Sequence, residues 1–189
     1  MAALAPSNAL FLIEESWNCY PHCKTVLING YLSKDTLRID VESLHVDENI
    51  QLPNALNLSP AELKERTVEY LDIRSAGSDP KFTFADPSTF KSVKTGRGPL
   101  ESGWEKSIKP VMCCYKVVRA QLKVFGLQTM GENTITNQQR NLFRSTLCKA
   151  FVTVDDWISV TMEEIRKLEG EVAAKSQASI KNAPSRENQ

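Results

Sequence analysis

The chain has 189 residues and a mass of 21.2 kDa, and its 41% hydrophobic and 24% charged residues are typical of a folded domain rather than of a disordered protein. Lysine plus arginine and aspartate plus glutamate each number 23, so the formal net charge is zero, which disfavours a general nucleic-acid binder. No apolar run reaches the roughly 18–20 residues of a membrane span, and the N-terminal residues lack the basic cluster of a secretory signal.

The cysteine content favours a reduced, cytoplasmic compartment. The five cysteines are odd in number and two of them are adjacent, which is a poor disulfide framework. They are Cys19, Cys23, Cys113, Cys114 and Cys148. With two histidines and no CxxC spacing, we expect no metal site.

Period-two alternation and β-branched residues predict four strands along the chain. The first spans Lys24–Ile28 and ends at an Asn-Gly turn, and the second spans Leu37–Val46. A third is expected at Thr67–Ile73, and the fourth and longest at Cys113–Lys123.

Capping signals and helical periodicity predict the helices. Ser59 begins a capping box with Glu62 and a proline at the first helical position. The C-terminal third carries one broad apolar face at three- and four-residue spacing. Its members are Leu142, Phe143, Leu147, Ala150, Phe151, Val154, Trp157 and Ile158. Thr161–Glu164 is a second capping box, and the polar tail 173–189 is expected to be disordered.

Three polar side chains break the strand alternation. Lys116 shares its face with apolar residues of the fourth strand, Ser43 falls on the apolar face of the second, and Thr25 shares a face with Cys23. An ammonium on an apolar face is unfavourable unless an anion meets it or the chain reaches to solvent. Lys116 therefore either snorkels at the strand end or holds an anionic head group at the mouth of an apolar cavity.

The remaining motifs are weaker. Trp17–Cys23 is a dense polar-aromatic segment that is compatible with a packed turn. Ser92–Leu100 superficially resembles a phosphate loop, but it lacks the GxxxxGK[ST] order and no predicted strand precedes it. We interpret it as a flexible surface loop and expect no nucleotide site. No spacing indicates a catalytic triad or an acid–base pair.

Several segments together resemble the phosphatidylinositol transfer proteins, most closely the small single-domain class. They lie in one colinear register from about residue 3 to residue 170. They are Trp17–Thr25, Phe90–Leu100, Met112–Lys116, Gly126–Gln128 and Asp155–Glu169.

The resemblance implies an α+β fold of the START-like helix-grip type, in which a curved antiparallel sheet surrounds a long C-terminal helix. The lipid-transfer domain would span 1–172, followed by the tail at 173–189. Such a domain sequesters one phosphatidylinositol or phosphatidylcholine and exchanges it during transient contact with membranes. No bond is made or broken, so the resemblance implies neither an enzyme nor a cofactor.

The resemblance also assigns head-group roles by position. Lys116 matches the family's phosphate-contacting lysine, and Thr25 and Ser43 match its phosphate-contacting hydroxyls. Asn18 and Glu169 match residues that hydrogen-bond the inositol ring.

Other matched positions concern modification and membrane contact. Cys23 matches a cysteine near the head group whose modification blocks lipid binding, and Ser92 matches a regulatory phosphorylation site. Ser43 replaces a threonine, which keeps the hydroxyl. Val124 and Phe125 replace a Trp-Trp pair that docks family members on membranes, so weaker membrane engagement is expected.

The largest departure lies at the start of the chain. Family members carry an upstream segment with early strands, a helix and two further inositol-reading residues, so the N-terminal strands are expected to be missing here. That predicts an open sheet edge, which is an aggregation risk. Two hypotheses remain: a phospholipid transfer protein, or a truncated, non-transferring isoform or fragment that acts as an interaction or regulatory module.

Overall fold

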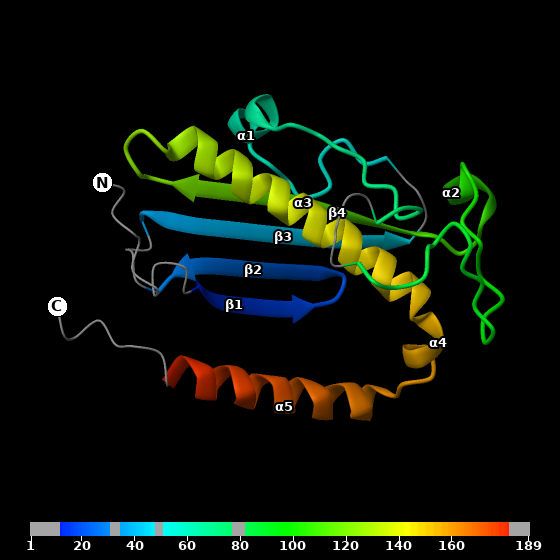
Figure 1. The fold of residues 1–189 in the computed structure, drawn as a ribbon. Helices are drawn as coiled ribbons and strands as arrows, with labels where there is room; N and C mark the ends of the chain where they lie inside the picture. Colours follow the sequence, from blue (N-terminus) through cyan, green and yellow to red (C-terminus); the bar gives the residue numbers. More distant parts are fainter. Residues whose placement is uncertain (1–11, 31–34, 48–50, 77–81, 182–189) are drawn as a thin grey trace.

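Four antiparallel strands form one sheet in the order β1-β2-β3-β4, and a long helix lies across one face of it (Figure 1). The computed structural model describes residues 12–30, 35–47, 51–76 and 82–181. The strands are β1 (Leu12–Cys19), β2 (His22–Asn29), β3 (Leu37–Asp47) and β4 (Met112–Leu122). The helices are α1 (Pro60–Glu65), α2 (Trp104–Ser107), α3 (Gln128–Val152), α4 (Val154–Trp157) and α5 (Met162–Lys181). The α+β class and the long helix predicted from the sequence are confirmed.

The longest strand pairing in the sheet joins β3 to the edge strand β4. The two strands pair along their whole length, from Leu37 opposite Leu122 to Asp47 opposite Met112. The alternation in β3 places Ile39 and Val41 on the same face, and both are buried. The strands predicted at Leu37–Val46 and Cys113–Lys123 are therefore confirmed to within one residue, and the one predicted at Lys24–Ile28 lies inside β2.

Helix α3 packs closely against β4. The Glu132 Oε1 accepts a hydrogen bond from the Leu122 backbone N–H at 3.0 Å, which ties the first turns of the helix to the end of the strand. A Cβ atom at Gly131 would overlap the Leu122 side chain, so the glycine permits this approach. This contact fixes which face of the sheet the helix covers.

A second buried cluster surrounds the C-terminal end of α3. The rings of Phe90 and Phe151 meet edge to face with centroids 5.6 Å apart. The buried members of the cluster are Leu100, Cys148, Val152 and Val154. Leu142, Trp157 and Ile158, which the sequence assigned to the apolar face, are instead exposed. Trp157 and Ile158 leave the buried face because the helix breaks at Thr153 between α3 and α4.

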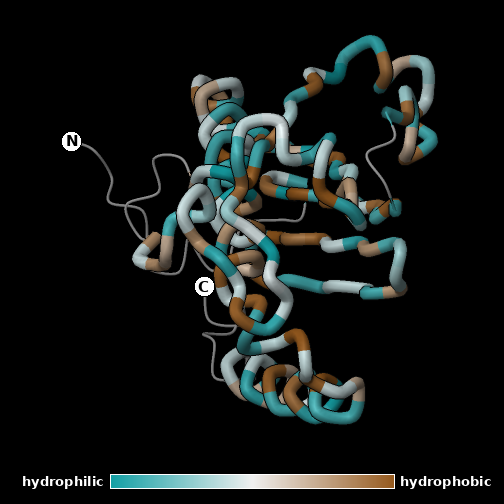
Figure 2. Tube along the Cα trace, turned by 90° about the vertical axis from the view of Figure 1, so that its right-hand side faces the viewer, coloured by the Kyte–Doolittle hydropathy of each residue, from teal (hydrophilic) through white to brown (hydrophobic). Residues whose placement is uncertain are grey.

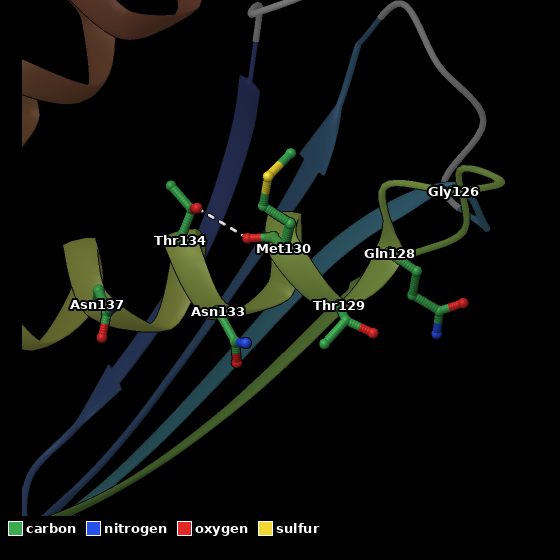
Figure 3. Close-up of a pocket in the computed structure, with 7 residues that line it drawn as sticks. All are labelled: Gly126, Gln128, Thr129, Met130, Asn133, Thr134 and Asn137. Carbon is green, nitrogen blue, oxygen red and sulfur yellow. Dashed lines mark hydrogen bonds between the residues drawn. The ribbon is translucent and has the colours of Figure 1, made fainter.

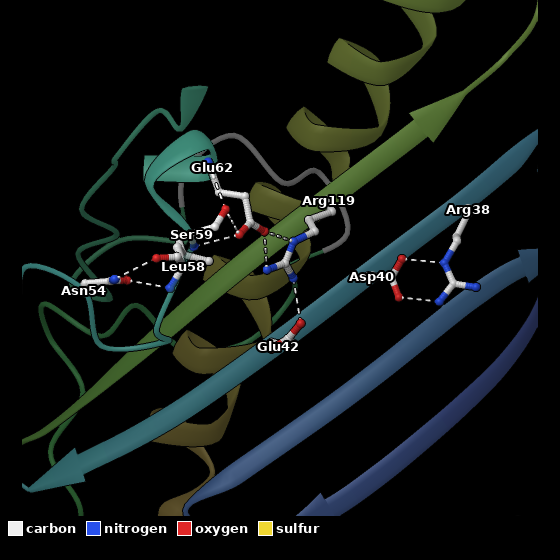
Figure 4. A network of polar contacts seen from close by, with 8 residues as sticks. All are labelled: Arg38, Asp40, Glu42, Asn54, Leu58, Ser59, Glu62 and Arg119. Atoms are coloured by element: carbon white, nitrogen blue, oxygen red, sulfur yellow. Dashed lines mark hydrogen bonds and ion pairs between the residues drawn. The ribbon is translucent and has the colours of Figure 1, made fainter. Parts of the chain in front are cut away.

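Helix α1 is tied to the opposite face of the sheet by one carboxylate (Figure 4). Glu62 accepts hydrogen bonds from the Ser59 backbone N–H at 2.9 Å and from the Ser59 hydroxyl at 2.7 Å, which confirms the predicted capping box. The same carboxylate accepts from Arg119 at 2.8 Å, and Arg119 also pairs with Glu42 at 2.6 Å. These bonds, foremost those from Ser59, lower the pKa of Glu62 to about 2.

The third predicted strand is wrong. Residues 67–73 form no strand and cross to α3 instead, where Glu69 pairs with Arg140 and the Ile73 carbonyl accepts from the Cys148 thiol. Side-chain contacts with a helix replace the ladder that the alternating pattern predicted. Conversely, β1 was not predicted as a strand, because its two adjacent glutamates interrupt the apolar–polar alternation.

The C-terminal helix α5 begins at the predicted capping box and extends further than predicted. Thr161 and Glu164 bond reciprocally, with the Thr161 N–H 2.8 Å from Glu164 Oε2. The helix continues to Lys181, past the start of the predicted disordered tail, because alanine, lysine and glutamine in this stretch are good helix formers. Residues 182–189 lie outside the described residues.

Helix α5 extends beside the β1 edge with little packing. Among the side chains from Met162 to Ser179, all except half-buried Ile165 are exposed. The hydropathy view shows apolar and polar positions alternating around this isolated helix (Figure 2). Met162, Leu168 and Val172 therefore leave an apolar stripe in solvent.

We expect Glu62→Gln to lower the thermal unfolding midpoint at neutral pH, because it weakens both the cap and the Arg119 pair. A carboxyl whose pKa is lowered on folding contributes stability above its unfolded value, and the contribution is lost as pH falls through the folded value. The difference from the wild type should therefore narrow between pH 4.5 and about pH 2. Circular dichroism melts across this range measure it, with Glu65→Gln as the control on the same helix. A difference that does not change with pH would contradict the assignment.

Candidate functional site

Four residues that the sequence assigned to head-group binding lie in one row across the whole sheet. The registers pair Asn18 with Cys23, Cys23 with Ser43, and Ser43 with Lys116. Directly opposed residues of antiparallel strands point to the same face. The row extends from the edge strand β1 to β4 on the face covered by α3, where Lys116 meets the Phe143 ring.

The ammonium of Lys116 is held by neutral groups. Its Nζ donates a hydrogen bond to the Ser43 Oγ at 2.8 Å and lies 4.9 Å from the centroid of the Phe143 ring. Ser43 is only 3% exposed, so the ammonium is turned inward rather than toward solvent. Among the described residues no carboxylate lies within ion-pair distance of this Nζ. A partly buried cation without a counter-ion favours an anion at this place.

At the other end of the row, a thiol orients an amide. The Cys23 Sγ donates to the Asn18 Oδ1 at 2.8 Å. This bond engages the oxygen of the Asn18 amide and leaves the two N–H donors of that amide to face elsewhere. A bulky group on the Cys23 sulfur would disturb both the amide and the row.

Thr25 lies on the same face, one row further along the sheet. The registers pair it with Ser16 on β1 and with Val41 on β3. The Thr25 and Ser16 hydroxyl oxygens are 3.0 Å apart. Ser16 is a polar neighbour that the sequence reasoning missed, since its strand was not predicted.

Cys114 adds a second thiol beside the ammonium. It shares the face of Lys116 two residues away on β4, and burial raises the pKa of the Cys114 thiol, an effect that Lys116 partly opposes. The thiol therefore stays protonated at neutral pH. Within the described ranges no group of three or more His, Cys, Asp and Glu side chains is arranged to hold a metal ion.

A hollow of about 190 Å³ borders Cys23 and Ser43 of the polar row. Cys23 and Ser43 of the row contribute to its lining, but Trp17, Lys24 and Glu42, which also line it, belong to the opposite face of the sheet. Lys116 is not among its lining residues. Ligand pockets for drug-sized molecules span about 300–1,000 Å³. The hollow is therefore too small for a two-chain lipid, and the Glu42 carboxylate in its lining disfavours a phosphate.

A larger recess lies elsewhere, at the beginning of α3 (Figure 3). It measures about 690 Å³ and is lined by exposed amides and hydroxyls such as Gln128, Thr129 and Asn133. None of the residues predicted to bind lipid lies in it, and its polar, open lining is unsuited to acyl chains. We therefore place the candidate site at the polar row itself, where the Lys116 ammonium lies against Ser43.

Ser92 lies in a closed turn rather than in a flexible loop. It is 2% exposed, and its hydroxyl donates to the Asp155 Oδ1 at 2.5 Å while accepting from the Thr95 N–H at 2.9 Å. Asp155 also accepts from the N–H groups of Val93 at 2.8 Å and Lys94 at 3.1 Å. The Ser92 bond is the main reason that the pKa of Asp155 lies below its usual value. A kinase reaches this hydroxyl only when the turn opens.

The remaining predicted residues lie apart from the row. Phe125 is fully exposed at the turn between β4 and α3, beside half-buried Val124. Glu169 is on α5, where it accepts from Arg166 at 2.6 Å. The structure thus brings Asn18 into the row but does not bring Glu169 to it.

No helix in the described part of the chain has both the length and the apolarity needed to cross a membrane.

Comparisons with known proteins all identify the same protein family. Residues 1–174 match the family model described as "Phosphatidylinositol transfer protein". Phosphatidylinositol transfer protein 1 of Dictyostelium discoideum is 42% identical over 171 residues, which cover 88% of this chain and 64% of that protein.

Animal relatives give the same result. The human phosphatidylinositol transfer protein beta isoform is 36% identical over 176 residues, covering 89% of this chain and 65% of that protein. Cytoplasmic phosphatidylinositol transfer protein 1 of Drosophila melanogaster is 38% identical over 182 residues, which cover 95% of this chain and 66% of that protein. The chain therefore spans about two thirds of the length of these curated relatives.

We expect Asp155→Asn to open the turn that holds Ser92, because a neutral amide accepts more weakly from the Val93 and Lys94 N–H groups. Hydrogen–deuterium exchange of this turn should become faster, and phosphorylation of Ser92 by a serine kinase in vitro should rise. Asp156→Asn removes the neighbouring exposed carboxylate and is the matched control. Equal protection in both variants would mean that Asp155 does not hold the turn closed.

Proposed function

The chain belongs to the phosphatidylinositol transfer protein family, and we propose that it binds one molecule of phosphatidylinositol or phosphatidylcholine non-covalently and transfers it between membranes. The observation that carries the proposal is the polar row across the sheet, which ends at an inward ammonium without a carboxylate partner in the described structure. A lipid phosphodiester supplies the anion that this ammonium favours.

The phosphate would be bound by Lys116 with help from two hydroxyls. Because the Ser43 oxygen accepts from Lys116, the hydroxyl hydrogen of Ser43 is directed away and can donate to a phosphate oxygen. Thr25 supplies a second hydroxyl on the adjacent row. Charge-assisted bonds such as the one from Lys116 are roughly twice as strong as neutral ones.

The inositol ring would be recognised at the β1 end of the row. Asn18 presents its amide N–H groups there, oriented by the thiol of Cys23. Glu169 would reach the ring when α5 packs against the sheet, which would also bury the exposed Leu168 and Val172. We propose that α5 closes over the bound lipid in this way.

The acyl chains provide the driving force for enclosure. Each buried methylene contributes about 0.8 kcal/mol, so two chains favour a dry, apolar surrounding by tens of kcal/mol. Transfer then requires opening at a membrane, where the exposed Phe125 and Val124 turn would make contact. The proposed activity is binding and release, in which no bond is broken and no cofactor takes part.

We place this activity in the cytoplasm. The name of the Drosophila relative supports this location.

A second candidate is a non-transferring isoform or fragment that acts as an interaction or regulatory module. It is favoured by the exposed side chains of β1 and by the exposed apolar stripe of α5. In that case the polar row would exist without a closed cavity around it.

Native mass spectrometry of the purified chain, followed by lipid extraction, tests the proposal directly. One phosphatidylinositol or phosphatidylcholine per chain is the expected result. Lys116→Ala should abolish binding of both lipids, because it removes the cation shared by their phosphates. Lys24→Ala is the matched control, since Lys24 lies on β2 beside Cys23 but points to the opposite face. A chain that is folded but empty would instead favour the second candidate.

Glu169→Ala should weaken phosphatidylinositol binding several-fold and leave phosphatidylcholine binding unchanged, because only inositol offers ring hydroxyls to a carboxylate. Competition between the two lipids in vesicles of known composition measures the ratio. Glu171→Ala, two residues along α5, is the control. An equal loss for both lipids would show that Glu169 does not read the ring.

A further inference from the structure

Three polar side chains on one face of β1 and β2 form a continuous chain of hydrogen bonds. The Ser16 hydroxyl donates to the Glu14 Oε1 at 2.9 Å, and the Ser16 and Thr25 hydroxyl oxygens are 3.0 Å apart. The register pairs Ser16 directly with Thr25, and Glu14 lies two residues before Ser16 on the same face. The chain of hydrogen bonds therefore ends at the Glu14 carboxylate on the edge strand β1.

Proton counting fixes the direction of this chain. A serine hydroxyl carries one hydrogen, so a Ser16 that donates to Glu14 has only lone pairs to offer Thr25. Thr25 must then be the donor in the bond that joins the two hydroxyls. Its single hydrogen points at Ser16 and not into the candidate site.

The charge of Glu14 makes this direction the stable one. A hydrogen bond to an ionised acceptor is roughly twice as strong as one between neutral groups. Ser16 therefore donates to the carboxylate in preference to Thr25. Glu15 cannot take over, because it lies on the opposite face, where it pairs with Val26.

We propose that Ser16 and Glu14 are positioning residues that weaken phosphate binding at Thr25. This inference rests on the proposed function, in which Thr25 donates to a lipid phosphate. To donate there, Thr25 has to give up its bond to Ser16, which then loses a donor. The relay thus opposes the attraction of Lys116 and makes release of the phosphate easier.

Ser16→Ala is the sharpest test, because it removes the acceptor of the Thr25 hydrogen and keeps every charge. We expect it to bind dihexanoyl phosphatidylinositol about two- to tenfold more tightly than the wild type in titration calorimetry, the range of one ordinary hydrogen bond. Binding of dihexanoylglycerol, which lacks the phosphate, should not change. Ser16→Thr keeps the hydroxyl and should restore wild-type affinity.

A second variant addresses the carboxylate. Glu14→Ala frees the Ser16 hydrogen to point at Thr25 and should tighten phosphate binding in the same direction. Glu15→Ala removes an equal charge from the other face of β1 and controls for electrostatic repulsion. In a Thr25→Val background, Ser16→Ala should have no effect on affinity.

The outcomes separate the relay from the function. If the wild type binds phosphatidylinositol and Ser16→Ala binds it equally or more weakly, the relay proposal is wrong and the function stands. Equal tightening for both short-chain probes also overturns it, since a general structural change would then be responsible. If the wild type binds neither probe, the proposed function fails and the relay proposal fails with it.

Discussion

The inward ammonium of Lys116 is the constraint around which the site is organised. It lies between β4 and α3, bonded to Ser43 and facing the Phe143 ring, with no carboxylate within ion-pair distance among the described residues. Such an arrangement persists only where the protein otherwise stabilises the charge, because desolvation disfavours a buried cation. The close packing of α3 on β4 through Gly131 therefore fixes an ammonium that a phosphate would stabilise.

The strict period of two in antiparallel strands explains why much of this site was predictable. Once the sequence assigns Ser43 and Lys116 to apolar faces, pairing of their strands in register places them together. The roles of Asn18 and Cys23, by contrast, came from family resemblance. Asn18 lies in the same row only because β1 pairs with β2. The adjacent glutamates of β1 interrupt the apolar–polar alternation that would predict this strand, so the row could not be derived from the sequence alone.

Elements whose structure depends on tertiary contacts were the ones missed. Residues 67–73 have a strand pattern but lie along α3, because Glu69 forms an ion pair with Arg140 and the Ile73 carbonyl accepts a hydrogen bond from the Cys148 thiol. The closed turn of Ser92 depends on Asp155, which is 63 residues away in the chain, a separation that local patterns do not reveal. Helix α5 was predicted to end early because its sequence is polar, although its alanines and lysines favour helix.

In the proposed function a carrier has to satisfy two opposed requirements, and the polar row together with the neighbouring Thr25 and Ser16 offers groups for both. Firm binding of a phosphate is favoured by Lys116 and by the free hydrogen of Ser43. Release at a membrane is favoured by any group that competes for the donors, and the Ser16 and Glu14 pair competes for that of Thr25. If the chain binds phosphate as proposed, a binding group on β4 and a competing group on the exposed strand β1 would give an intermediate affinity. An exchange protein needs that balance more than it needs the tightest possible site, because a lipid held too firmly is never delivered.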